Sequence, residues 1–96
     1  MDLIEIRAQI DILDDQIVGL LAKRSGLVSA AGKLKKDEAG VRDPKRVQQV
    51  IEKIRARAAA AGLDPMIGEE IYRTIIGCFV SKELRELTVG RGNPVQ

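Results

Sequence analysis

The chain has 96 residues, and its 16 basic and 14 acidic side chains are mixed along a sequence that contains no histidine. This length fits one domain, and the nearly balanced charge differs from the one-signed surface typical of nucleic-acid-binding proteins. Without histidine, neither a Ser-His-Asp nor a Cys-His catalytic site can form, and a zinc site is not expected. An enzyme made from this chain would rely on arginine, lysine, carboxylates and hydroxyls.

The composition favours a helical bundle, because alanine, isoleucine and leucine are common while the chain has one Phe, one Tyr and no Trp. The N-terminus lacks the basic flank and apolar core of a secretory signal, and no apolar run is long enough to span a membrane. We therefore expect a cytoplasmic protein with no membrane or nucleic-acid partner. Cys78 lies in an apolar run, which predicts a small buried side chain.

The first predicted element is a long helix from about Leu3 to Lys36. Apolar residues recur there at alternating spacings of four and three, the pattern of a helix that packs on other helices. We call these positions the seam: Ile6, Ile10, Leu13, Ile17, Leu20, Arg24, Leu27 and Ala31. At 1.5 Å per residue the helix would be roughly 50 Å long, whereas a compact chain of this size has a radius of gyration of about 13 Å. A second copy of the chain is the simplest cover for the seam, so we expect a homodimer.

Two further helices follow a loop at residues 37–41. The pair Asp43-Pro44 is a helix start signal, and Gly62 marks the end of that helix. A second Asp-Pro pair starts the last helix, predicted for residues 65–88, whose middle is apolar around most of its circumference and should be central and buried. Residues 89–96 are predicted to be a flexible tail. The chain is thus predicted to be one all-α domain with three helices and a core of residues 3–88.

Arg24 is a cation at a seam position, where burial of an unpaired charge would cost several kcal/mol. It could form an ion pair with an acidic residue of another helix, or it could belong to an anion-binding site inside the bundle. Lys35 lies about three turns farther along nearly the same side, and Arg46 lies in the first turn of the second helix. Arg7 is seventeen residues before Arg24, roughly 25 Å away. These two could share a ligand only across an antiparallel dimer.

Glu83 is the other charge that departs from the pattern. It falls on the helix face shared by Tyr72, Ile76 and Phe79. Its simplest interpretation is a partner for one of the cations.

Five short motifs occur in order along residues 3–87. They are Ile6-Arg7 with Ile10-Asp11-x-Leu13-Asp14, Leu20-Leu21-Ala22-Lys23-Arg24, Gly32-Lys33-x-Lys35, Val41-Arg42-Asp43-Pro44-x-Arg46, and Leu63-Asp64. With these motifs the chain resembles the small all-helical chorismate mutases and the related isochorismate pyruvate-lyases and 4-amino-4-deoxychorismate mutases.

The resemblance implies an intertwined homodimer with two equivalent active sites, a chorismate-like dicarboxylate substrate, no cofactor or metal, and a role in the shikimate pathway to aromatic amino acids. By matching positions, Arg7 would come from the other subunit, and Arg24 and Arg46 would bind the substrate's carboxylates. Lys35 would point at the ether oxygen, and Asp43 would lie near the ring hydroxyl. Conversion of chorismate to prephenate is pericyclic, so it needs the substrate oriented and donors aimed at the ether oxygen.

Two positions depart from the usual mutase pattern. The family commonly has a glutamate after Arg46 that receives the ring hydroxyl, whereas this chain has Val47, as the pyruvate-lyases do. Glu83 stands where a glutamine more often donates to the ether oxygen. An ionised carboxylate cannot donate, although burial would favour its protonated form and Lys35 would oppose it.

These residues predict a chorismate mutase in which Lys35, Glu83 and Arg24 are catalytic and Val47 helps to bind the substrate. An isochorismate pyruvate-lyase or a 4-amino-4-deoxychorismate mutase of secondary metabolism is the alternative within the same superfamily. A non-catalytic helical dimer, with Arg24 in a structural ion pair, is the alternative from a different class.

Overall fold

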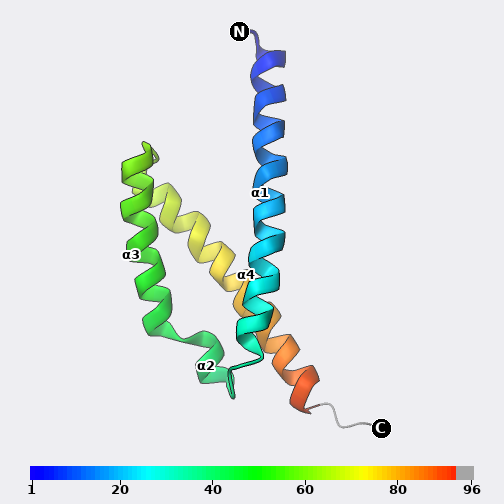
Figure 1. Ribbon diagram of the computed structural model, residues 1–96. Helices are drawn as coiled ribbons and strands as arrows, with labels where there is room; N and C mark the ends of the chain where they lie inside the picture. Colours follow the sequence, from blue (N-terminus) through cyan, green and yellow to red (C-terminus); the bar gives the residue numbers. More distant parts are fainter. Residues whose placement is uncertain (93–96) are drawn as a thin grey trace.

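The computed structural model describes residues 1–92 of the chain, which form an all-α fold of three long helices and one short helix. In chain order these are α1 (Leu3–Gly32), α2 (Glu38–Arg42), α3 (Pro44–Ala61) and α4 (Pro65–Gly92). Helix α4 is central, as predicted, because it contacts each of the other three helices (Figure 1). None of these helices combines the length and apolar character needed to cross a bilayer.

An aspartate caps the start of each helix by accepting a hydrogen bond from a backbone N–H two or three residues farther on. The pairs are Asp2 with Glu5 at 2.9 Å, Asp37 with Gly40 at 2.8 Å, Asp43 with Arg46 at 3.2 Å, and Asp64 with Met66 at 2.9 Å. Both predicted Asp-Pro helix starts are therefore confirmed. The predicted end of α3 is also confirmed, because Gly62 follows it in the left-handed conformation at φ 82°.

Asp43 lies between two helices, as the C-cap of α2 and the N-cap of α3. Its φ of 34° lies in the left-handed region, which aspartate tolerates better than most residues with a side chain. Only this residue separates the two helices, so the first turn of α3 follows directly on the end of α2. This sharp corner places the side chains of both helix ends near α4.

Three predicted boundaries are wrong. Helix α1 ends at Gly32 rather than near residue 36, because the chain leaves the helix in a turn in which the N–H of Lys35 donates to the carbonyl of Gly32 at 3.1 Å. The predicted loop at 37–41 contains α2, which Asp37 caps. Helix α4 continues past residue 88 to Gly92, since a single glycine costs a helix only about 1 kcal/mol. Residues 93–96 of the predicted tail lie outside the described part of the chain.

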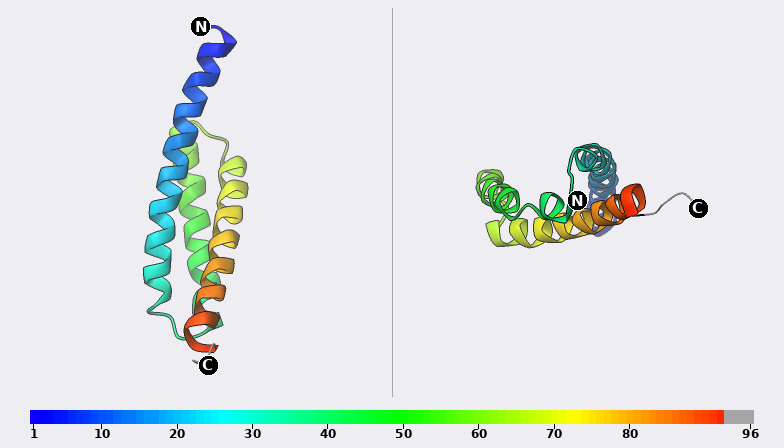
Figure 2. Two further views of the ribbon diagram at one scale, coloured as in Figure 1. Left: turned by 90° about the vertical axis from the view of Figure 1, so that its right-hand side faces the viewer. Right: turned by 90° about the horizontal axis from the view of Figure 1, so that it is seen from below.

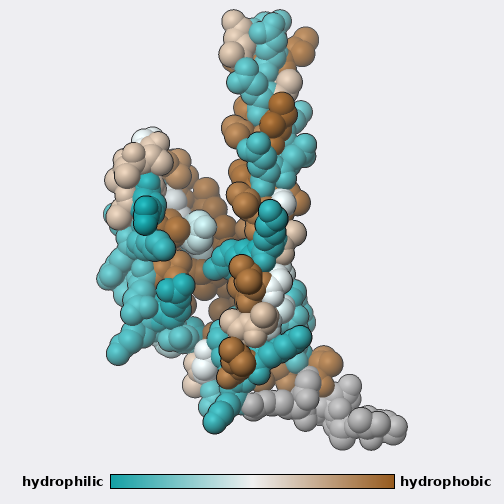
Figure 3. Space-filling model, in the orientation of Figure 1, coloured by the Kyte–Doolittle hydropathy of each residue, from teal (hydrophilic) through white to brown (hydrophobic). Residues whose placement is uncertain are grey.

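The N-terminal half of α1 stands clear of the other helices (Figures 1 and 2). The Cα radius of gyration is 16.9 Å, and the molecule measures 59 × 30 × 16 Å along its principal axes. The six large apolar side chains of the seam are 42–73% exposed, and apolar residues are visible along the protruding half in Figure 3. A single chain therefore leaves most of its seam in water.

The prediction that the middle of α4 is buried is wrong for a single chain. The other three helices all lie on one side of α4 (Figure 2, right), and Cys78 in the middle of α4 is exposed. The expected burial of Cys78 is therefore not found. Helix α4 packs closely on α3 where Gly68 is buried, and a Cβ at Gly68 would lie 3.1 Å from that of Ala58.

An exposed charge cluster also joins α3 to α4. The Glu69 carboxylate pairs with Arg73 of its own helix and with Arg55 of α3, both at 2.7 Å. The hydrogen bond from Arg73, followed by that from Arg55, lowers the pKa of Glu69 from its usual value.

Candidate functional site

A cavity of about 330 Å³ lies between the C-terminal half of α1, the α2–α3 corner and the C-terminal half of α4. Its wall is apolar except for four basic and two acidic side chains: Arg24, Lys35, Arg42, Arg46, Asp43 and Glu83. Formal charge in the wall is therefore positive by two units. A small molecule with two carboxylates would balance it.

Six of the seven predicted site residues line this cavity: Arg24, Lys35, Asp43, Arg46, Val47 and Glu83. They come from distant parts of the sequence and are brought together by the α2–α3 corner and by the packing of α1 on α4. Arg7 is not among the lining residues, because it lies on the exposed N-terminal half of α1. The cavity of one chain thus gathers the predicted set without the arginine that was expected from a second chain.

Arg24 is half-buried in the wall of the cavity. Its Cζ lies 4.9 Å from the centroid of the Phe79 ring, a cation–π arrangement that supports the guanidinium from one side. Among the described residues, Arg24 Nη1 is the one buried side-chain nitrogen or oxygen without a hydrogen-bond partner. A buried donor left unpaired costs about 1–3 kcal/mol. An anionic ligand in the cavity would remove that cost.

The structural ion pair considered for Arg24 is not found within the described chain. The ion pairs of residues 1–92 join Lys35, Arg42, Arg55, Arg73 and Lys82 to carboxylates, and none includes Arg24. Of the two interpretations of this seam cation, the geometry of the chain favours an anion-binding site.

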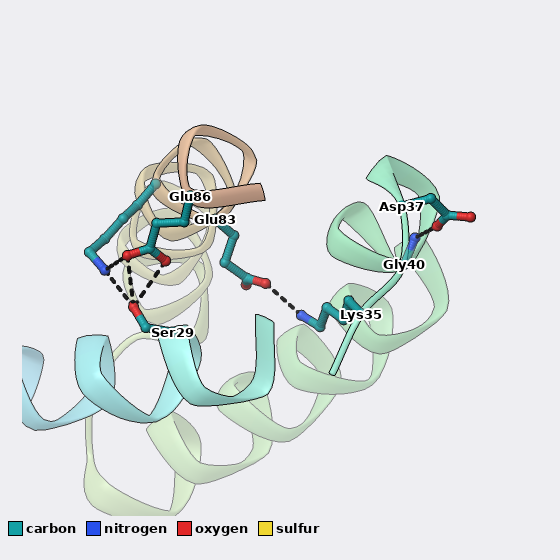
Figure 4. Close-up of polar contacts among 7 residues, drawn as sticks. Ser29, Lys35, Asp37, Gly40, Glu83 and Glu86 are labelled. Atoms are coloured by element: carbon teal, nitrogen blue, oxygen red, sulfur yellow. Dashed lines mark hydrogen bonds and ion pairs between the residues drawn. The ribbon is translucent and has the colours of Figure 1, made fainter. Parts of the chain in front are cut away.

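Glu83 pairs with Lys35, which confirms the expectation that it partners one of the cations. The distance from Lys35 Nζ to Glu83 Oε2 is 2.9 Å (Figure 4). Glu83 is only 6% exposed, whereas the Lys35 side chain is 28% exposed at the cavity wall. A lysine ammonium has three donors, so Lys35 can hold Glu83 and still direct another N–H at a ligand.

A second cluster ties α1 to α4 next to this pair (Figure 4). The Ser29 hydroxyl donates to both oxygens of Glu86 at 3.0 and 3.1 Å, and Lys82 Nζ lies 2.6 Å from the same carboxylate. The hydrogen bond from Lys82 lowers the pKa of Glu86 from its usual value. These contacts hold α1 and α4 together next to the point where the Glu83 side chain projects from α4.

The α2–α3 corner supplies the rest of the charged wall. Asp43 uses one carboxylate oxygen to cap α3, and Arg42 Nε binds Glu38 at 2.8 Å. Arg46 is exposed, so its guanidinium can reach into the cavity without losing a protein partner. Val47 contributes an apolar, half-buried side chain.

Among the lining residues that were not predicted from the sequence as site residues, Arg42 carries a charge and Phe79 an aromatic ring. Arg42 occurs in the fourth motif, but nothing in its spacing distinguishes it from a solvated side chain. Phe79 lies one turn before Glu83 on the same face of α4, which was a usable signal, because a residue on that face can meet the same helix that Glu83 meets.

Comparison with known proteins shows which family this chain belongs to. A family model described as chorismate mutase type II matches residues 6–84, a range that includes all seven predicted site residues. The chain is 31% identical over 90 residues to a protein named isochorismate pyruvate lyase from Pseudomonas aeruginosa, covering 94% of this chain and 89% of that protein. It is 32% identical over 76 residues to a protein named chorismate mutase from Methanocaldococcus jannaschii, covering 77% and 76%. The chain therefore belongs to the chorismate mutase type II family.

Proposed function

We propose that this protein catalyses the rearrangement of chorismate to prephenate. The observation that carries the proposal is the unpaired, buried Nη1 of Arg24 in a cavity whose wall has two excess positive charges. Chorismate is a dicarboxylate, so it would neutralise the cavity and satisfy the free donor. The name of the relative from Methanocaldococcus jannaschii supports the same reaction.

The proposed roles follow from the chemistry of the side chains. Arg24 and Arg46 bind the two carboxylates, since a guanidinium can make bidentate contacts with a carboxylate. Lys35 donates to the ether oxygen, where negative charge grows as the C–O bond breaks. The cavity holds the enolpyruvyl group over the ring while the C–C bond forms, so catalysis consists of orientation and electrostatic stabilisation. Asp43 lies near the ring hydroxyl.

Isochorismate is the second candidate substrate, giving salicylate and pyruvate. The specific observation in its favour is Val47, which presents an apolar side chain where mutases commonly place a glutamate for the ring hydroxyl. The relative from Pseudomonas aeruginosa is named for this reaction. A 4-amino-4-deoxychorismate mutase is a third possibility of the same kind, because it also differs at the ring substituent.

An NMR time course separates these reactions. The purified protein is incubated in separate tubes with chorismate, isochorismate and 4-amino-4-deoxychorismate, at pH 5 and at pH 7.5. Prephenate from chorismate supports the proposal, whereas intact chorismate with salicylate and pyruvate from isochorismate supports the lyase. If all three compounds are consumed no faster than in the absence of protein, the enzymatic proposal is wrong.

We also propose that the active form is a homodimer in which the partner's copy of Arg7 completes each cavity. The exposed seam supports this, because six large apolar side chains are left in water by one chain. Arg7 lies on the same exposed half of α1, roughly 25 Å from Arg24, and so cannot reach the cavity of its own chain.

A mixing experiment tests the shared site. Arg7→Ala and Arg24→Ala should each be nearly inactive, but the two variants refolded together should recover about a quarter of wild-type activity, since half of the dimers are mixed and each mixed dimer has one intact site. Arg7→Ala refolded with the double variant Arg7→Ala/Arg24→Ala is the control, and it should recover nothing. Equal recovery in both mixtures would contradict the shared site.

Glu83→Gln is expected to raise kcat/KM for chorismate about tenfold at pH 7.5. An ionised Glu83 cannot donate to the ether oxygen, whereas its protonated form and the glutamine amide both can. The variant should therefore turn over chorismate faster than the wild type at pH 7.5. The measurement is kcat/KM of both proteins at pH 7.5.

Glu86→Gln is the matched control for this variant, because Glu86 lies on the same helix near Glu83 but does not line the cavity. It should keep kcat/KM at pH 7.5 within about twofold of the wild type. If Glu83→Gln instead loses activity at pH 7.5, the reaction needs the carboxylate itself rather than a hydrogen-bond donor at this position.

A further inference from the structure

We infer that Gly32 is a positioning residue for Glu83: the last residue of α1 must lack a side chain so that the Glu83 carboxylate can lie against it and face Lys35. This inference rests on the proposed function for its catalytic consequence. The contact itself is a feature of the fold, and it can be tested without a substrate.

The geometry at Gly32 leaves little room. A Cβ built on Gly32 would lie 3.1 Å from Glu83 Oε2, 3.5 Å from its Cγ and 3.6 Å from its Cδ. A separation of 3.1 Å between carbon and oxygen is shorter than ordinary van der Waals contact, so the carboxylate would have to move by a few tenths of an ångström. The oxygen that would be displaced is the one that binds Lys35 at 2.9 Å.

Gly32 also fixes the other half of this pair. Its carbonyl accepts the N–H of Lys35 at 3.1 Å, which closes the turn that carries Lys35 away from α1. Gly32 therefore begins the turn that positions Lys35, and it also leaves the space that the Glu83 carboxylate occupies. Because Glu83 is only 6% exposed, its carboxylate could avoid a new methyl group only by shifting toward the cavity that it lines, away from its present position.

Space, rather than backbone conformation, is the reason for glycine here. Among the described glycines, the positive φ belongs to Gly62, so alanine at position 32 keeps an allowed backbone. Gly26 of the same helix has nothing within 4 Å of its built Cβ. It lies two residues after Arg24 and so about 200° around the helix axis from it. Gly26 is thus a matched control with the same substitution and no neighbour.

The first test measures the thermal stability of Gly32→Ala in the wild-type and Glu83→Ala backgrounds, with Gly26→Ala in the same two backgrounds as the control. Gly32→Ala should lower Tm by about 3 °C in the wild-type background, because the methyl group displaces a buried carboxylate. In the Glu83→Ala background the same substitution should leave Tm unchanged or raise it, since alanine is the better helix former. Gly26→Ala should have the same small effect in both backgrounds. Equal loss of Tm from Gly32→Ala in both backgrounds would overturn the inference.

The second test measures turnover of whichever substrate the NMR experiment identifies. Gly32→Ala should lower kcat about three- to tenfold and leave KM within about twofold, because a displaced Glu83 would shift the Lys35 ammonium that is proposed to stabilise the developing charge. Gly26→Ala should change neither constant. An unchanged kcat for Gly32→Ala would overturn the positioning role. If the wild type turns over no substrate, the proposed function fails, whereas the stability cycle still decides whether Gly32 makes room for Glu83.

Discussion

Arg24→Ala is expected to lower kcat/KM for chorismate by about three orders of magnitude while the protein remains folded. Its Nη1 is buried and has no hydrogen-bond partner among the described residues, so a carboxylate of the substrate would satisfy this donor. Removing a buried group that pairs with a ligand charge typically costs roughly 2–5 kcal/mol of binding. Each 1.4 kcal/mol corresponds to a factor of about ten.

The stability of the same variant separates an active site from a structural ion pair. Breaking a buried ion pair by removing one partner costs about 3–5 kcal/mol of folding free energy. In residues 1–92 Arg24 has no carboxylate partner, and its contact with Phe79 contributes only about 1–2 kcal/mol. We therefore expect a small change in the denaturant midpoint of Arg24→Ala. Loss of the fold in this variant would favour the non-catalytic dimer.

Two controls make the result specific. Lys45→Ala removes a neighbouring charge in the first turn of α3 that does not line the cavity, and it should keep kcat/KM within about twofold. Arg24→Lys keeps the charge but loses the planar fork, so its activity should lie between the wild type and Arg24→Ala. Calorimetry with a bicyclic dicarboxylate that mimics the transition state should show tight binding to the wild type and none to Arg24→Ala.

Helix starts were predictable from the sequence because they depend on a few neighbouring atoms. The pair Asp43-Pro44 combines a side-chain acceptor for the first free N–H groups with a residue that needs no N–H partner, and both act within one turn. The end of α1 was not predictable in this way. Residues 33–36 are good helix formers, and only the turn at Lys35 and the cap at Asp37 decide that the chain leaves the helix there.

The burial of a side chain depends on how the helices cross. The spacing of apolar residues along one helix does not specify these crossings. Cys78 lies in an apolar run, yet it is exposed, and the other three helices all lie on one side of α4. The contact of Phe79 with Arg24 likewise depends on the angle between α1 and α4. By contrast, the absence of Arg7 from the cavity followed from the length of a straight helix, since seventeen residues separate it from Arg24.

Lys35→Met is expected to lower kcat by about 10²–10³ with a much smaller change in KM, because the proposed donor acts on charge that develops only in the transition state. The variant also leaves Glu83 as a buried carboxylate without its partner at 2.9 Å. We expect a loss of roughly 3 kcal/mol in unfolding free energy. The measurements are steady-state kinetics and urea denaturation, with Lys36→Met as the control, because Lys36 is exposed and does not line the cavity.

A double variant separates the two effects of losing Lys35. Lys35→Met/Glu83→Gln removes both charges of the pair, so most of the lost stability should return, since a neutral amide is far less costly to bury than an unpaired carboxylate. The kcat should remain about 10²-fold below that of Glu83→Gln alone, because the amide can supply its own donor but cannot replace the ammonium at the ether oxygen. If kcat instead rises to the level of Glu83→Gln, the role of Lys35 is to hold Glu83 in place, and the transition-state donor must be sought among the arginines of the cavity.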